Sequence, residues 1–161
     1  MTNGFSEREF RDAMSQFCTG VVVVSGQTEA GPAGFSVQSF VSVSLDPPLI
    51  AVCPALGSTS WPKIRDLPNF GINILGVHQE DLCKRFASPN IDRFEGVAWT
   101  PSPYGTPMLD DTLGFIDCAL EAEHDAGDHA LVVARVLEFQ LHEPLRNPLL
   151  FFRGSFGSFA G

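Results

Sequence analysis

The sequence predicts a mainly β protein, an antiparallel β-barrel that is closed or nearly closed and carries helices at its periphery. About six or seven segments have the character of strands, whereas only two or three short helices can be placed. Strands and helices do not alternate regularly, as they would in a doubly wound parallel sheet. Closure of a barrel would also remove the exposed edges of the long apolar strands.

Length and composition fit one globular domain over residues 1–161. Apolar residues make up 44% of the chain and charged residues 18%, which excludes a disordered protein. The net charge is −9 and no basic block is present, so a nucleic-acid partner is not expected. No apolar run is long enough for a membrane span, and the start of the chain lacks signal-peptide features. We therefore expect a cytoplasmic location and no membrane partner.

The first element is a helix. Ser6 and Glu9 match a capping box, and Phe5 can pack on Phe10, so the helix begins here, and Gly20 ends it. Apolar side chains recur along one face at helical spacing, at Phe10, Ala13, Met14 and Phe17.

Five further segments follow before the middle of the chain. Residues 21–25 predict a buried strand, residues 26–34 a glycine-rich loop, and residues 35–45 one unbroken alternating strand. Asp46-Pro47-Pro48 predicts a turn, since two prolines cannot continue a ladder, and residues 49–53 predict the next strand.

The second half reads as helices and strands around one long irregular stretch. We expect a short helix starting near Ser58 with Pro62 in its first turn, and a helix over residues 79–86. A Pro-rich surface excursion is expected over residues 88–107. The expected strands cover residues 71–75, 112–123, 129–142 and 149–153.

Common catalytic and cofactor motifs are absent. The sequence has no G-x-G-x-x-G after a strand, no P-loop, no H-E-x-x-H and no G-x-S-x-G. The four cysteines lie 30 or more residues apart without any C-x-x-C, so no metal site is predicted and the thiols are expected to be buried. A nucleotide cofactor would therefore have to bind on the barrel itself.

One face of the strand predicted over residues 35–45 carries uncharged polar side chains, at Ser36, Gln38, Ser42 and Ser44. Such groups can hydrogen-bond the carbonyls and nitrogens of a flat heteroaromatic ring, or a ribityl chain, without adding charge. The alternative is a polar strand face that packs against another chain.

Two further segments can bind parts of a ligand. The consecutive hydroxyls of Ser58, Thr59 and Ser60 precede a helix and suit either a phosphate or simple N-capping. His129 stands where a turn meets a long strand, where its ring can donate to a substrate carbonyl or shuttle a proton, or can be only a turn residue. His124 is a competing candidate.

Cations are few, so their positions are informative. Arg153 follows an apolar run and is followed by Gly154; it suits a phosphate or carboxylate, or a snorkelling side chain, and Phe156 beyond it can lie over a ring. Lys84 and Arg85 can contact a phosphate, but we favour a role at the C-terminus of their helix.

Taken together, these segments resemble the flavin reductase-like, FMN-binding split-barrel family, and in particular the short-chain reductases of two-component flavin monooxygenases. The resemblance rests on their order along nearly the whole chain, in residues 17–24, 34–49, 58–64, 70–75, 79–87, 126–129 and 148–154. No single segment is specific, but the ordered set is.

The resemblance implies a homodimer of antiparallel split barrels that passes a hydride from NADH to FAD or FMN and supplies free reduced flavin to a partner monooxygenase. With so few cations, NADPH is less favoured than NADH. His129 would lie beside the nicotinamide as the catalytic residue. The implied flavin contacts are Ser36, Val37, Gln38, Ser39, Cys53, Pro54, Ala55, Ser58, Thr59, Lys84 and Phe156. Phe156 stands where the family commonly has tyrosine, which removes a hydroxyl.

A flavin-binding sensor or storage protein without turnover is the main alternative. An enzyme resembling pyridoxamine-phosphate oxidases would need a basic phosphate cluster, which the sequence lacks. A barrel for an apolar ligand would need an apolar interior, which the polar strand face argues against.

Overall fold

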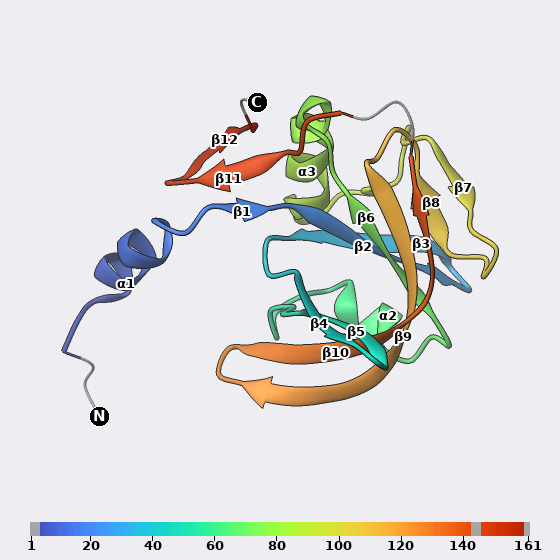
Figure 1. The fold of residues 1–161 in the computed structure, drawn as a ribbon, viewed down its shortest axis with the longest axis horizontal. Helices are drawn as coiled ribbons and strands as arrows, with labels where there is room; N and C mark the ends of the chain where they lie inside the picture. The colour runs from blue at the N-terminus through green and yellow to red at the C-terminus, as the bar shows by residue number, and fades with distance from the viewer. Residues whose placement is uncertain (1–3, 143–145, 160–161) are drawn as a thin grey trace.

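A seven-stranded antiparallel sheet forms the body of the molecule (Figure 1), in a computed structural model that describes residues 4–142 and 146–159. The strand order is β3-β2-β6-β9-β10-β5-β4. The strands are β2 (Val22–Thr28), β3 (Gly31–Val37), β4 (Val41–Leu45), β5 (Pro48–Val52), β6 (Phe70–Ile74), β9 (Gly114–Ala126) and β10 (His129–Leu141). The prediction of a mainly antiparallel β fold is confirmed.

The sheet curls so that its two edge strands follow each other in the chain. No ladder joins β3 to β4 within the described residues, which leaves the barrel split between them. The crossing segment between the two strands is held by Ser39, whose hydroxyl accepts a hydrogen bond from the Cys53 amide at 2.9 Å. The split therefore lies beside the end of β5.

The prediction of one unbroken strand over residues 35–45 is wrong. The chain leaves the ladder after Val37 and re-enters it at Val41 in order to cross between the two sheet edges. The predicted loop over residues 26–34 is also wrong, because β2 and β3 pair along this stretch as a hairpin. Gly31, with φ of +116°, begins the return strand, a backbone conformation that favours glycine.

Two long strands build the other side of the barrel, as predicted. β9 and β10 are each 13 residues long and pair from His129–Ala126 to Leu141–Gly114. Gly127, with φ of +72°, makes the tight turn between them. The turn thereby places Asp128 and His129 at the end of the barrel.

Two smaller sheets flank the body. One contains β1 (Thr19–Gly20), β11 (Leu150–Phe152) and β12 (Ser155–Gly157), and the other contains β7 (Trp99–Pro101) and β8 (Pro107–Leu109). The predicted surface excursion over residues 88–107 is therefore wrong in part. Its side chains Phe94, Ser102 and Thr106 are buried, and Ser102 donates to the carboxylate of Asp117 at 2.9 Å.

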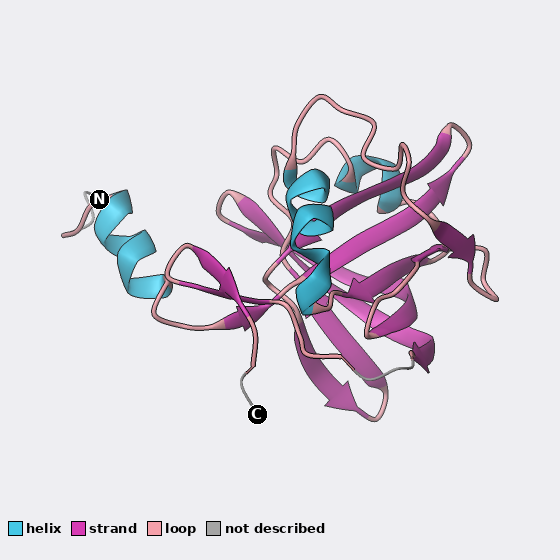
Figure 2. Ribbon diagram, turned by 90° about the horizontal axis from the view of Figure 1, so that it is seen from above, coloured by secondary structure: helices cyan, strands magenta, loops and turns pink. Residues whose placement is uncertain are grey.

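The helices lie outside the barrel, as predicted. They are α1 (Glu7–Met14), α2 (Trp61–Ile64), a short 3-10 helix η1 (Val77–Gln79) and α3 (Glu80–Ala87). In α1 the capping box of Ser6 and Glu9 is confirmed, and Phe5 stacks on Phe10 with ring centroids 5.8 Å apart. The helix ends at Met14, well before the predicted stop at Gly20. None of its residues is buried, and it stands away from the barrel (Figure 2).

The core has two parts. One fills the barrel, where Trp61 of α2 packs edge-to-face on Phe70 with centroids 5.5 Å apart. The other lies between the sheet and α3, where Phe86 packs edge-to-face on Phe94 at 5.0 Å. Both α2 and α3 are thereby fixed against the sheet. Among the described residues, the model contains no helix with the length and hydropathy that a membrane span requires.

Candidate functional site

A cavity of about 680 Å³, here called the large cavity, opens where the end of β3, the β5–α2 turn, α3 and the β9–β10 turn meet. Its lining brings together eleven of the twelve residues proposed from the sequence. They are Ser36, Val37, Gln38, Ser39, Cys53, Ala55, Ser58, Thr59, Lys84, His129 and Phe156. Pro54 does not line the cavity; its carbonyl accepts a hydrogen bond from the Ala130 amide at 2.9 Å and so anchors the start of β10.

Uncharged polar groups form one wall of the large cavity. The Ser36 hydroxyl donates to the carbonyl of Cys83 in α3 at 3.1 Å, which leaves its lone pairs available to accept from a ligand. The Gln38 side-chain oxygen accepts from Thr19 at 3.4 Å, and no described residue hydrogen-bonds its amide nitrogen. The Ser39 hydroxyl bonds the backbone of Cys53 and is structural. Among Ser36, Gln38 and Ser39, the Gln38 amide is therefore the donor left for a ligand.

The hydroxyl of Ser58 is held by backbone amides. It accepts hydrogen bonds from the amides of Ser60 and Trp61, at 3.3 and 3.1 Å, and so holds the turn that leads into α2, whose N-cap residue is Ser60. No described residue hydrogen-bonds the exposed hydroxyl of Thr59, the next residue in the cavity wall. The end of the cavity at Thr59 is thus free to bind a polar group.

His129 lies in the cavity wall with its ring held in place. Its Nδ1 is 2.7 Å from the carboxylate of Asp128, a hydrogen bond that lowers the pKa of Asp128 below its ordinary value. With Nδ1 engaged, Nε2 is the ring atom left for a ligand. His124 pairs with Leu131 in the hairpin and does not line the cavity, whereas His129 does.

Cations form only a small part of the cavity wall. Lys84 pairs with Glu80 at 2.6 Å, which raises the pKa of the ammonium group, and this group lies 5.5 Å from the ring centroid of Phe156. Arg85 points elsewhere and donates to three carbonyls of the 92–95 loop. Arg153 donates to Gln16 and does not line the cavity.

Sequence reasoning missed part of the wall. Asn90 and Arg93 come from the stretch expected to be a surface excursion, and Cys83 and Phe86 from the buried face of α3. Burial raises the pKa of the Cys83 thiol, which keeps it protonated and unreactive at neutral pH. No local signal marked Arg93, which stands between Asp92 and Phe94-Glu95 in the sequence.

This arrangement suits a flat, polar-edged ring with an anionic tail. The walls contain apolar side chains such as Val21, Phe35 and Phe86, which can pack on a ring, and uncharged donors at one side. Arg93 and Lys84 add positive charge to the wall, which suits an anionic group. An isoalloxazine ring with a ribityl phosphate has this distribution of polarity, so the residues fit a flavin.

Comparisons with known proteins agree with this geometry. The family described as "Flavin reductase like domain" matches residues 14–160. The reductase subunit HsaB of a flavin-dependent monooxygenase from Rhodococcus jostii (strain RHA1) is 43% identical over 150 residues, which cover 92% of this chain and 76% of that protein. The FMN reductase (NADH) SmoA of Agrobacterium fabrum (strain C58 / ATCC 33970) is 40% identical over 157 residues, which cover 98% of this chain and 88% of that protein.

A solved structure shows the same fold. The NADH:FAD oxidoreductase SgcE6 of Streptomyces globisporus C-1027, in complex with NAD and FAD fragments, superposes with a TM-score of 0.91 at 29% identity. The superposition covers 99% of this chain and 96% of that chain. The fold, the matched family and the sequence relatives lead to one conclusion: the chain belongs to the flavin reductase-like family.

Proposed function

We propose that this chain is an NADH-dependent flavin reductase that transfers a hydride to FAD or FMN and supplies the reduced flavin to a partner monooxygenase. The observation that carries the proposal is the large cavity, whose wall combines ring-packing residues, uncharged donors and His129 within one space. The flavin supplies the hydride acceptor and NADH the hydride. The protein therefore needs no nucleophile, and within the described part of the chain the cavity contains no catalytic triad.

The residues of the cavity act by positioning. Hydride transfer requires the two reacting atoms to approach within about 3–3.5 Å, so stacking geometry is the main contribution of the protein. The Gln38 amide and the Ser36 hydroxyl orient the flavin ring from one wall. Nε2 of His129 orients the nicotinamide carboxamide from the other side, because Asp128 holds Nδ1.

The names of the relatives support the partner and the donor. HsaB is a reductase subunit of a flavin-dependent monooxygenase, and SmoA is named as an FMN reductase that uses NADH. We propose the same division of labour here, with the reduced flavin leaving to a separate oxygenase. Loose binding of the flavin suits this role, because the reduced flavin must leave. A micromolar dissociation constant corresponds to a binding free energy of about −8 kcal/mol.

We also propose that the chain works as a homodimer. Two groups of exposed large apolar side chains stand out among those of the described chain: Phe10, Met14 and Phe17 on and just after α1, and Val43, Leu45, Phe139 and Leu141 on β4 and β10. Leu45 is 92% exposed and Phe17 is 79% exposed, and a second copy of the chain would cover these apolar side chains. Light scattering after gel filtration tests this proposal: a dimer mass supports it and a monomer mass at micromolar concentration refutes it.

A cytoplasmic location is part of the proposal. All four cysteines are free thiols, and Cys18 is exposed, which suits a reducing compartment.

Release of the reduced product distinguishes a reductase from a flavin sensor or store. The purified chain is mixed with excess FAD or FMN and NADH without oxygen, and the solution is passed through a membrane that retains protein. We expect the flavin in the filtrate to be fully reduced at many equivalents per chain. Reduction of only the flavin retained with the protein would favour the sensor or storage function.

A further inference from the structure

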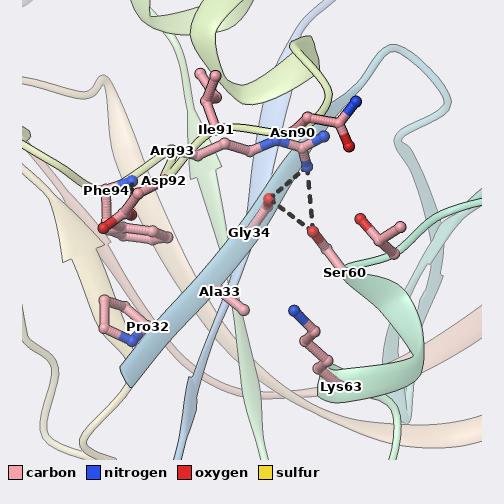
Figure 3. A pocket seen from close by; sticks show the side chains of 11 residues that line it. Pro32, Ala33, Gly34, Ser60, Lys63, Asn90, Ile91, Asp92, Arg93 and Phe94 are labelled. Atoms are coloured by element: carbon pink, nitrogen blue, oxygen red, sulfur yellow. Dashed lines mark hydrogen bonds between the residues drawn. The ribbon is translucent and has the colours of Figure 1, made fainter. Parts of the chain in front are cut away.

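A second cavity of about 190 Å³, here called the side cavity, adjoins the large one. Thr59, Asn90 and Arg93 line both, so the two cavities meet at these residues. The rest of the side cavity is formed by β3, the start of α2 and the loop over residues 90–94 (Figure 3). Within the wall Lys63 and Arg93 are the cations and Asp92 is the carboxylate.

Arg93 is held in place by neutral partners. Its Nε donates to the Ser88 carbonyl at 2.9 Å, and its Nη1 donates to the Gly34 carbonyl at 2.9 Å and the Ser60 hydroxyl at 3.1 Å. Among the described residues no carboxylate pairs with Arg93, and its Nη2 makes no hydrogen bond. Burial lowers the pKa of this guanidinium, since its charge is partly removed from water. An anion in the side cavity would compensate for that loss.

Lys63 reaches into the same space. Its ammonium group points toward the side cavity from α2 (Figure 3), and no described residue forms an ion pair with it. The Asp92 carboxylate accepts a hydrogen bond from the Phe94 amide at 3.0 Å and keeps its charge, so the wall contains two cations and one carboxylate. The side cavity therefore has an excess of positive charge in a chain whose net charge is −9.

The loop that carries Arg93 is fixed before any ligand binds. Arg85 donates to the carbonyls of Asp92, Arg93 and Glu95, each at 2.8 Å. Phe94 packs edge-to-face on both Phe86 and Trp99. A pre-formed cationic site loses little conformational entropy when it binds an anion.

We propose that the side cavity binds the second phosphate of FAD, through Lys63 and Arg93, and thereby favours FAD over FMN as the flavin. The inference rests on the proposed function, which puts the ring of the flavin in the large cavity. FMN ends at its first phosphate, whereas FAD continues through a diphosphate to adenosine. A diphosphate that passes Thr59 on leaving the large cavity reaches the space between Lys63 and Arg93.

Binding to the flavin-free protein tests this inference without relying on turnover. Dissociation constants for FAD and FMN are measured by calorimetry for the wild type, Lys63→Gln and Lys63→Arg. An exposed ammonium–phosphate contact contributes about 1 kcal/mol, or about fivefold in affinity. We expect tighter binding of FAD than FMN by the wild type, an FAD constant raised about fivefold in Lys63→Gln, and restoration in Lys63→Arg. The dissociation constant for FMN should change less than about twofold in Lys63→Gln.

Arg135→Gln is the matched control. It removes one positive charge from the exposed pair with Glu121 on the hairpin, outside both cavities, so it corrects for the change in net charge. Equal losses of affinity for FAD and FMN in Lys63→Gln would place Lys63 at the first phosphate and overturn the inference. A selective loss of NADPH binding would assign the side cavity to its 2′-phosphate and also overturn it. Failure of the wild type to bind either flavin would instead refute the proposed function.

Discussion

Replacement of His129 by alanine tests the assignment of the nicotinamide position. Nδ1 of His129 is engaged with Asp128 at 2.7 Å, so only Nε2 remains and the substitution removes one hydrogen bond to the substrate. The side chain is 45% exposed, so water replaces part of what is lost. A net hydrogen bond of this kind is worth about 1 kcal/mol. We therefore expect kcat/KM for NADH to fall about fivefold.

The assay is steady-state NADH oxidation at saturating flavin, together with calorimetric binding of the flavin. The flavin dissociation constant should stay near the wild-type value, since the loss concerns NADH. Asp128→Ala should reproduce part of the effect, because it frees the ring to rotate. His124→Ala, on the same hairpin but outside the cavity, is the control. Unchanged kcat and KM for NADH in His129→Ala would remove this residue from the site.

Two predictions concern stability. Gly71→Ala should lower the free energy of unfolding by about 1–3 kcal/mol, because the added Cβ would overlap the Phe115 ring and lie 2.9 Å from the Thr106 methyl. Urea titration measures this loss, and the control is Gly20→Ala, where the added Cβ has open space. Equal unfolding midpoints for the two variants would contradict the prediction. Burial raises the pKa of Asp117, so the folded state binds its proton more tightly than the unfolded state, and stability should fall as pH rises from about 4 through the raised pKa. Asp117→Asn should flatten this slope in thermal unfolding across that range, and a slope that persists would contradict the assignment.

Local sequence signals predicted the elements that depend on neighbouring residues. The capping box at Ser6, the two long strands joined at Gly127 and the helix predicted over residues 79–86 were each confirmed, because caps, turns and periodicity act over a few residues. The unbroken alternation over residues 35–45 was misleading. The sequence pattern is continuous there, but closure of the barrel makes the chain leave one edge and join the other.

Some residues of the large cavity were likewise predicted from the sequence, and others were not. The residues on β3, the β5–α2 turn and the hairpin turn were found because their types and order resemble a family. Arg93 was missed because its role depends on the Arg85 hydrogen bonds that fold the 92–95 loop against α3, a tertiary arrangement with no local pattern. The apolar side chains of α1 recur at helical spacing as predicted, but none of the residues of this helix is buried in the structure, because burial depends on tertiary contacts that spacing along one helix does not specify.

Flavin-dependent oxidation of NADH by the purified chain is the decisive measurement of flavin reductase activity. The loss of NADH absorbance is followed first without flavin and then with increasing FAD, FMN or riboflavin. The proposed reductase activity predicts negligible oxidation without flavin and a saturable rate when FAD or FMN is added, with NADH preferred over NADPH. Clear flavin binding with no turnover from either nicotinamide would contradict it and leave His129 without a catalytic role.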